Sequence, residues 1–407
     1  MIHTKFAALW ASVLMVLCTP LNSFAQLMVS EQTEWQAILN EAKANHKSYV
    51  FLDAYTDWCG WCKVMDQKTF SDSSVFNRMN TVFVTAKIEM EKTETGRMIA
   101  MKYGINSFPT FLIFNTDGRL VYKLVGYHTI PRFQEALTKA LNPENQFKKP
   151  GYADGFISYP TIYKQAFAEK NKRAFADSAA FEAWYATVTN LADEATWRTI
   201  NRYYYLLDYD KTRMITSQKD VFIQLFGADE FDKLMGDIAS SWIRQASKFK
   251  NDTLADLAIS LVQYNFTEEP ERMALMYRIH YLNECERWKE LAYAIEEVFH
   301  SYDKYITDDY LNTYAWNIYE KCTDPEVLNL AVGWLHLTVN SETSWHVWDT
   351  YACLLFKTEQ FNKAEKAAQT AIKMGKAEDK NVTATETLLK NIQEAQKAGQ
   401  KGGATRE

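Results

Sequence analysis

Two of the six cysteines in this 407-residue sequence lie close together, as Cys59 and Cys62 in the stretch DWCGWCK. The apolar segment SYVFLDAY ends just before them and predicts a buried strand, and the residues after them predict a helix. At the start of a helix, unpaired backbone N–H groups and the helix dipole stabilise an anion, so a thiol there has a pKa below its free value of about 8.5. We therefore expect Cys59 to be a partly exposed, nucleophilic thiolate.

Cys62 follows on the same helical face, one turn further in, where it can form a disulfide with Cys59. Such a thiol can resolve a mixed disulfide by attacking the Cys59 sulfur. A zinc site is one alternative, but the sequence has neither a second Cys-x-x-Cys nor a closely spaced histidine pair. A structural disulfide is another, although so small a ring restrains little chain. We favour redox chemistry at the pair, with no metal or other cofactor.

Asp53 lies inside the predicted strand, where a carboxylate without partners would be costly. Burial should raise its pKa, so that it can accept or return the proton of Cys62. A surface aspartate on an edge strand is the alternative. Pro109 directly precedes another predicted strand, and because most X-Pro bonds are trans, the local sequence alone favours trans there.

The elements around these residues alternate between helix and strand. The Asp117-Gly118 pair between two apolar runs indicates a hairpin. The order predicts an α/β domain over residues 26–142, with a central mixed sheet, helices on both faces and an antiparallel hairpin near its end. Helices are predicted over 33–45, after the cysteine pair, over 97–103 and over 131–141, and strands over 48–55, 82–88, 110–115 and 120–126.

Residues 31–141 resemble the thioredoxin family. The resemblance rests on the WCGxC core at 58–62, on Asp53 with Lys87 as its usual neighbour, on KYGI before Pro109, and on the Val-Gly pair at 125–126. It implies that Cys59 is the attacking thiol, Cys62 the resolving thiol, and Asp53 with Lys87 a proton relay. It also implies that the peptide bond before Pro109 is cis. This proline would line the substrate groove and keep metals off the dithiol. The substrate-binding residues expected from the resemblance are Trp58, Gly60, Trp61, Phe108 and Pro109.

Two features depart from thioredoxin itself. Trp61 stands where thioredoxin has proline, and since residues between the cysteines tune the reduction potential, reducing strength does not carry over. The stretch 63–80 is also longer than in thioredoxin. In this respect the domain is similar to thioredoxin-like domains of periplasmic disulfide reductases of Gram-negative bacteria and to their secreted relatives.

The first 25 residues are typical of a secretory signal peptide. Lys5 precedes an apolar run over 6–17, and small residues stand at the two positions before a cleavage site near Ala25. An uncleaved anchor is the alternative, but the run is shorter than the roughly 20 residues that span a bilayer. We predict an exported, periplasmic protein with no integral membrane segment after cleavage.

After a predicted linker at 143–151, the sequence indicates a helical domain over 152–394, with a disordered tail at 395–407. Two units near 308–375 have the residue spacing of tetratricopeptide repeats, and a thioredoxin-like domain fused to such a region is similar to other exported thioredoxin-family proteins. The positions that carry the repeat pattern are Leu311, Tyr314, Ala315 and Ile318 in the first unit, and Trp348, Tyr351, Ala352, Leu355, Ala364, Ala368 and Ala371 in the second.

Two functions remain open from the sequence. The first is an exported thiol-disulfide oxidoreductase, acting as a reductant or isomerase on client proteins and receiving electrons from a membrane or soluble thiol donor. The second is a helical scaffold or binding protein of the cell envelope with an accessory thioredoxin domain. A net charge of -6 argues against a nucleic-acid partner. Cys285, Cys322 and Cys353 are interpreted as small buried apolar residues.

Overall fold

The computed structural model describes residues 34–146, 149–302, 307–340 and 342–403, and its contacts divide the chain into two compact units. The first unit holds the described residues up to Gln146 together with Ala153–Ala180. The second holds Lys149–Tyr152 and the described residues from Phe181 onward. The predicted domain ranges stay a prediction, but the contacts group 153–180 with the first unit, whereas the sequence placed them in the helical domain.

The first unit is built on a four-stranded sheet in the order β2-β1-β3-β4. β1 pairs with β2 in parallel and with β3 in antiparallel, and β3 and β4 form the expected antiparallel hairpin. The predicted mixed sheet is therefore confirmed. The strands are β1 (Tyr49–Tyr55), β2 (Phe83–Glu89), β3 (Thr110–Asn115) and β4 (Leu120–Val125).

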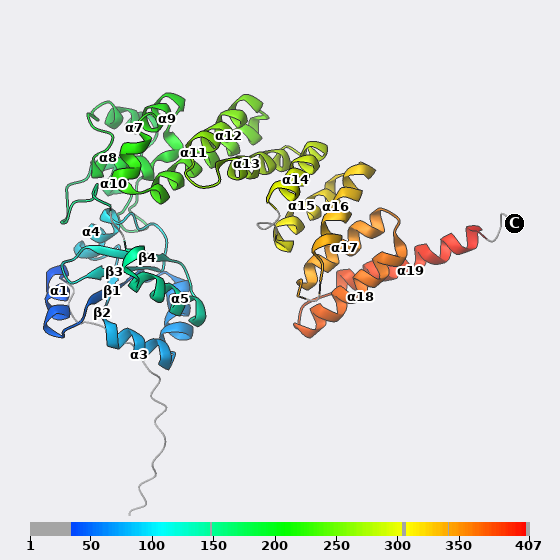
Figure 1. Cartoon of the computed structure of the whole chain (residues 1–407), viewed down its shortest axis with the longest axis horizontal. Coiled ribbons are helices and arrows are strands. Elements are labelled where there is room, and N and C mark those ends of the chain that lie inside the picture. The colour runs from blue at the N-terminus through cyan, green and yellow to red at the C-terminus, as the bar shows by residue number, and fades with distance from the viewer. Residues whose placement is uncertain (1–33, 147–148, 303–306, 341, 404–407) are drawn as a thin grey trace, which may run out of the picture. The chain divides into compact units, whose positions relative to one another are not determined.

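Helices cover both faces of this sheet (Figure 1). The sequence predicted a helix after the cysteine pair but missed the separate helix α3, whose first turn is capped by Asp72 accepting from two backbone N–H groups. The helices of the first unit are α1 (Trp35–Ala44), α2 (Gly60–Met65), the π-helical turn η1 (Asp66–Phe70), α3 (Ser73–Val82), α4 (Glu94–Lys102), α5 (Ile130–Leu141), the 3-10 turn η2 (Pro143–Asn145) and α6 (Thr161–Gln165).

Strand alternation decides which side chains meet which helices. The rings of Phe51 and Phe111 stack with their centres 5.5 Å apart, on the sheet face that packs against Met65 of α2 and Phe133 of α5. Phe114 points to the opposite face, where Trp35 of α1 contacts it at 4.5 Å. Because side chains two apart in a strand share a face, Asp53 lies on the same face as Phe51, the face covered by α2.

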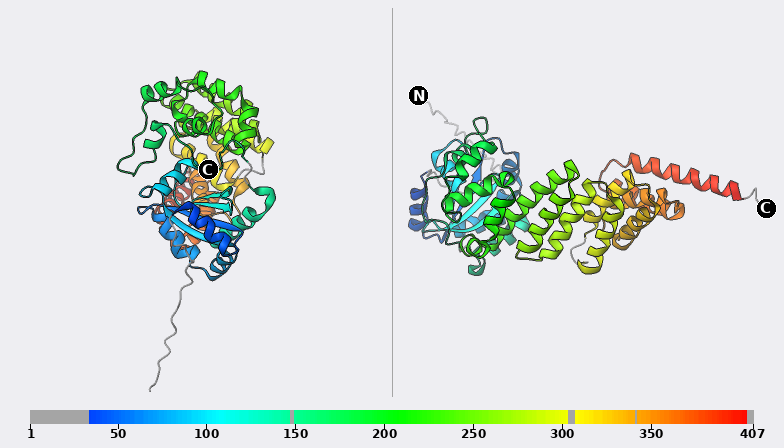
Figure 2. Two further views of the ribbon diagram at one scale, coloured as in Figure 1. Left: turned by 90° about the vertical axis from the view of Figure 1, so that its left-hand side faces the viewer. Right: turned by 90° about the horizontal axis from the view of Figure 1, so that it is seen from above.

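From Ser178 onward the elements are helices packed one after another. Successive helices contact each other from α10 to α14 and from α15 to α19 (Figures 1 and 2). No helix in the described part of the chain has both the length and the apolar character needed to cross a bilayer. The helices are α7 (Ser178–Tyr185), α8 (Glu194–Arg202), the 3-10 turn η3 (Tyr204–Leu206), α9 (Tyr209–Thr216), α10 (Lys219–Phe226), α11 (Ala228–Phe249), α12 (Asp252–Asn265), α13 (Pro270–Glu284), α14 (Trp288–Tyr302), α15 (Asp308–Lys321), α16 (Pro325–Thr338), α17 (Trp345–Lys357), α18 (Phe361–Ala377) and α19 (Thr383–Gly403).

Two sequence expectations fall on the last helices. The small residues that define the second repeat unit, Ala352 of α17 with Ala364 and Ala368 of α18, are fully buried where these two helices pack together. Assignment to the tetratricopeptide class stays a proposal. The tail from residue 395 was expected to be disordered, but α19 continues through Gly403. Its alanine, glutamine and lysine residues are good helix formers, which explains the difference.

A mostly buried carboxylate joins residues 149–152 to the rest of the second unit. Glu230 of α11 accepts hydrogen bonds from Lys149 at 3.0 Å, from the Trp197 indole at 3.2 Å and from the Tyr152 hydroxyl. Burial alone would raise the pKa of Glu230, but the charges of Arg198 and Lys149 lower it to about 2. This carboxylate is therefore ionised and paired throughout the physiological pH range.

The cysteines outside the pair behave largely as the sequence suggested. Cys322 and Cys353 are buried, and burial raises the pKa of both thiols, that of Cys353 to about 12. Both therefore act as small apolar residues. Cys285 is only partly buried.

Candidate active site

Helix α2 begins at the cysteine pair. Cys59 is the N-cap residue, with extended backbone dihedrals, and its Sγ accepts a hydrogen bond from the Cys62 backbone N–H at 3.0 Å. The Cys59 N–H donates to the Thr56 carbonyl at 3.0 Å, which closes the turn between β1 and α2. The two cysteines form a disulfide with a Cα–Cα distance of 5.4 Å. The predicted position of Cys59 at the start of a helix is therefore confirmed.

The expected exposure of Cys59 is wrong for this oxidised form. Both cysteines are only 4% exposed. The Cys59 sulfur is bonded to the sulfur of Cys62 and accepts the Cys62 backbone N–H. The surface at this point is formed by the flanking indoles, with Trp58 48% and Trp61 60% exposed. The acidity of the Cys59 thiol belongs to the reduced form and stays a prediction.

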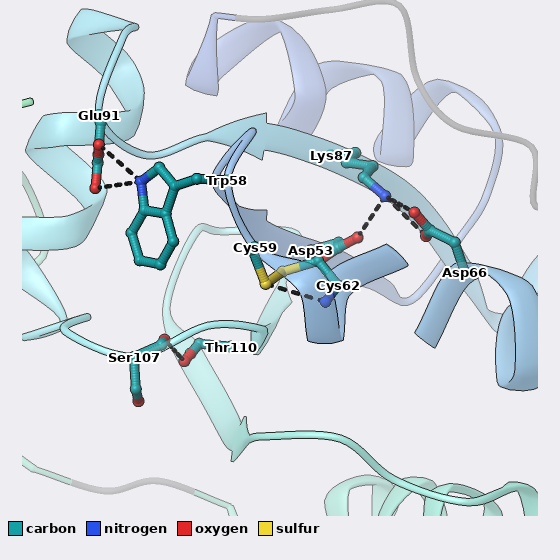
Figure 3. Close-up of a disulfide and its surroundings, with 9 residues drawn as sticks. All are labelled: Asp53, Trp58, Cys59, Cys62, Asp66, Lys87, Glu91, Ser107 and Thr110. Carbon is teal, nitrogen blue, oxygen red and sulfur yellow. Dashed lines mark hydrogen bonds and ion pairs between the residues drawn. A yellow bond between two sulfur atoms is a disulfide. The ribbon is translucent and has the colours of Figure 1, made fainter. Parts of the chain in front are cut away.

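Asp53 is buried, and of the two residues opposite it on the neighbouring strands, Lys87 and Phe111, only Lys87 is charged. Lys87 of β2 stands opposite Asp53 of β1, and its Nζ lies 3.2 Å from Asp53 Oδ2. The other carboxylate oxygen, Oδ1, is buried and has no hydrogen-bond partner. Lys87 also donates to both oxygens of Asp66 at 2.8 and 2.7 Å, so it bridges two carboxylates (Figure 3).

Burial dominates the ionisation of this group. Desolvation raises the pKa of Asp53 from 3.8 to about 6, against the opposing charge of Lys87, while the negative charge of Asp66 adds to the increase. Burial alone would lower the pKa of Lys87, but Asp53 and Asp66 raise it overall. Asp53 can therefore change protonation state near neutral pH while Lys87 remains a cation.

The loop before β3 forms another side of the site (Figure 3). The Phe108–Pro109 bond is cis, as the family resemblance implied. Gly126 N–H donates to the Pro109 carbonyl at 2.8 Å, and the Thr110 hydroxyl donates to the Ser107 carbonyl at 2.8 Å. The first bond ties the loop to the end of the β3–β4 hairpin, and the second closes the loop onto the first residue of β3.

Aromatic side chains connect this loop to the cysteine turn. The ring of Phe108 lies edge-on to Trp58 at 5.7 Å, and Trp61 lies 5.7 Å from Tyr127. A side chain at Gly60 would meet nothing within 4 Å, so this position opens outward. The residues expected to bind substrate thus lie around the disulfide, but their role in binding stays a prediction.

Two site residues were missed by the sequence analysis. Asp66 follows Cys62 by one helical turn, a spacing that could have indicated it. Glu91 lies two residues after the end of β2, is 5% exposed, and accepts the Trp58 indole N–H at 3.2 Å to each oxygen (Figure 3). No group of three or more potential metal ligands occurs among the described residues.

The fold and the site together define a thioredoxin-fold domain with a redox-type cysteine pair. A mixed four-stranded sheet carries the pair at the first turn of the helix after β1, opposite a cis-proline loop, with a buried acid below. The family model of a thioredoxin-like domain matches residues 35–141. This part of the chain belongs to that family.

Among known proteins, the thiol:disulfide interchange protein DsbD of Pectobacterium atrosepticum is 30% identical over 105 residues, which are 25% of this chain and 18% of that protein. A protein disulfide-isomerase of Zea mays is 28% identical over 125 residues, 30% of this chain and 24% of that protein. A solution structure from Bacteroides thetaiotaomicron, provisionally named as a disulphide-isomerase, is 32% identical with a TM-score of 0.27, covering 29% of this chain and 94% of that one. The chain thus spans less than a quarter of each of these two curated relatives.

Proposed function

We propose that this protein is a thiol-disulfide oxidoreductase that exchanges disulfides with client proteins through Cys59 and Cys62. The observation that carries the proposal is the geometry at the start of α2, where the Cys62 N–H donates to Cys59 Sγ and the helix dipole presents positive charge to that sulfur. In the reduced form the same arrangement would stabilise a Cys59 thiolate.

The exchange proceeds in two displacements. The Cys59 thiolate attacks one sulfur of a client disulfide, forming a mixed disulfide and expelling the other client sulfur as a thiolate. Cys62 then loses its proton and attacks Cys59 Sγ, which breaks the mixed disulfide and releases the second client thiolate. The client gains two electrons, and the cysteine pair is oxidised to the disulfide that this structure contains.

Asp53 is proposed to take the Cys62 proton. Its Oδ1 is buried without a hydrogen-bond partner, and its pKa of about 6 allows it to accept a proton and to return it near neutral pH. Lys87, held between Asp53 and Asp66, keeps the carboxylate oriented through Oδ2. The geometry thus leaves one oxygen for the proton and one for the ion pair.

The cellular setting is proposed from sequence and resemblance. The signal at 1–25 lies outside the described residues, and together with the likeness to DsbD it supports export to the periplasm. There the pair would act on disulfide-containing client proteins as a reductant or isomerase, and a membrane or soluble thiol donor would restore the dithiol. The helical unit is proposed to bind the client or the donor.

Reduction of the interchain disulfide of insulin, with dithiothreitol as electron donor, tests the activity. The full mature chain should accelerate precipitation of the insulin B chain, and Cys59→Ser should abolish the acceleration. Cys285→Ser is the matched control, because that partly buried cysteine lies in the helical unit. Full activity in the Cys59 variant would remove the proposal and leave the scaffold alternative.

A further inference from the structure

We infer that Arg173 and Lys170, which lie outside the thioredoxin-like match, are positioning residues for the active-site Trp58. They belong to Ala153–Ala180, here called the extension, which groups with the first unit. The inference rests on the proposed function, because it assigns Trp58 to client binding.

The buried carboxylate of Glu91 is where the extension meets the site. One of its oxygens pairs with the Arg173 guanidinium, and the other accepts the Lys170 backbone N–H at 3.1 Å. Both oxygens also accept the Trp58 indole N–H. A charge buried to this degree needs partners, and among the described residues Arg173 of the extension is the only cation paired with the Glu91 carboxylate. Arg173 therefore keeps Glu91 in place, and Glu91 holds the indole.

Lys170 contacts the same indole from another direction. Its Nζ lies 4.4 Å from the centre of the Trp58 ring, within the range of a cation–π interaction. Trp58 also contacts the Phe108 ring of the cis-proline loop, with the ring centres 5.7 Å apart. The indole is thus held at its N–H by Glu91, with an ammonium group on the ring and an aromatic edge beside it.

The extension is anchored firmly enough to position these groups. The Tyr163 side chain of α6 is 1% exposed, and its hydroxyl donates to the Met101 carbonyl of α4 at 2.7 Å. Lys102 of the same helix donates to the Ala153 carbonyl at 2.7 Å. Arg173 Nε donates back to the Ala168 carbonyl at 3.1 Å, which fixes the turn that carries both cations.

This arrangement predicts an effect on client binding rather than on thiol chemistry. Trp58 is about half exposed and adjoins Cys59, so it offers a flat apolar surface to a client. In the described part of the chain, Arg173 and Lys170 interact with Glu91, Ala168 and Trp58, and form no hydrogen bond or ion pair with Asp53, Lys87 or the sulfurs. Loosening Trp58 should therefore raise KM for a protein disulfide and leave kcat nearly unchanged.

The first experiment measures the position of Trp58 directly, in the full mature chain, without any activity. The indole N–H resonance of Trp58 is assigned by its loss in Trp58→Phe. It should shift in Arg173→Ala, move back toward its wild-type position in Arg173→Lys, and stay unchanged in Lys172→Ala. Lys172 is the matched control because it is an exposed cation of the same segment that pairs only with Glu169. An unshifted resonance in Arg173→Ala would overturn the inference.

The second experiment measures insulin reduction. Arg173→Ala should raise KM about tenfold, the effect of losing one charged hydrogen bond, and Lys170→Ala about threefold, the effect of an exposed cation–π contact. If Arg173→Ala does not fold, the double variant with Glu91→Gln removes the unpaired buried charge and should show the raised KM. Wild-type KM in a folded Arg173 variant contradicts the inference. Absence of activity in the wild type refutes the proposed function alone, because the resonance still decides the position of Trp58.

Discussion

Replacing Asp53 by asparagine should make the stability of the first unit less dependent on pH. The Asp53 side chain is 5% exposed, and burial raises its pKa from 3.8 to about 6. The folded state therefore holds this proton to a higher pH than the unfolded state does. Its stability must fall as pH rises from about 4 to about 6, because ionising the buried carboxyl is costly.

The magnitude follows from the two pKa values. They differ by about two, and one pKa unit corresponds to about 1.4 kcal/mol, so the expected change is about 3 kcal/mol. Asparagine has nearly the same shape and does not ionise in this range. Part of this change already occurs below pH 4, so between pH 4 and pH 7 the free energy of unfolding of Asp53→Asn should increase by about 2.5 kcal/mol relative to that of the wild type.

Hydrogen exchange of the β1 and β3 amides is the suitable assay, since it reports opening of this sheet separately from the helical unit. The oxidised protein is measured at several values between pH 4 and pH 7. Asp57→Asn serves as the control, because Asp57 is 54% exposed and pairs with Lys92 at the surface. A constant difference between Asp53→Asn and wild type across this range would refute the assignment of a raised pKa.

Three further predictions follow from buried or crowded groups. Asp66→Asn should lower the pKa of Asp53, as measured by NMR of the carboxyl carbon, because the negative charge of Asp66 contributes to raising it; an unchanged or higher midpoint would contradict this. Glu230→Gln should destabilise the helical unit by about 3–5 kcal/mol at pH 7, because it removes the negative charge that faces Lys149 and Arg198 in this mostly buried cluster. The wild-type contribution of Glu230 should be present above about pH 4.5 and be lost as pH falls toward 2, since its pKa is lowered to about 2; exchange of the α11 amides measures both effects. Gly96→Ala would place a methyl group 2.0 Å from the Glu89 carbonyl oxygen, so it should lower the free energy of unfolding by about 1–3 kcal/mol or more. Gly155→Ala is the control, because its methyl group would meet nothing within 4 Å and should change the free energy of unfolding little. Amide hydrogen exchange measures both.

The local parts of the fold and site could be predicted from the sequence because their causes are local. The β3–β4 hairpin follows from Asp117-Gly118 between apolar runs, and its first strand has the predicted bounds. Cys59 at the N-cap follows from an apolar strand that ends just before a helix. The burial of Asp53 follows from its apolar neighbours within a seven-residue strand.

The missed features depend on pairs far apart in the chain. Asp66 joins the site through Lys87, 21 residues away, and this contact requires the exact register between β1 and β2. Arg173 and Glu91 are 82 residues apart, and no periodic pattern connects them. The inward position of Cys59 in the disulfide form is likewise a matter of tertiary packing, which the helix-start argument does not contain.

The nucleophilicity of Cys59 is most directly tested by the pH dependence of its alkylation. The reduced protein is treated with iodoacetamide from pH 5 to pH 10, and the rate is followed on the Cys59 peptide by mass spectrometry. A rate midpoint at least about one pH unit below the free-thiol value of about 8.5 is the expected result. A midpoint at or above that value would contradict an activated thiolate at the start of α2.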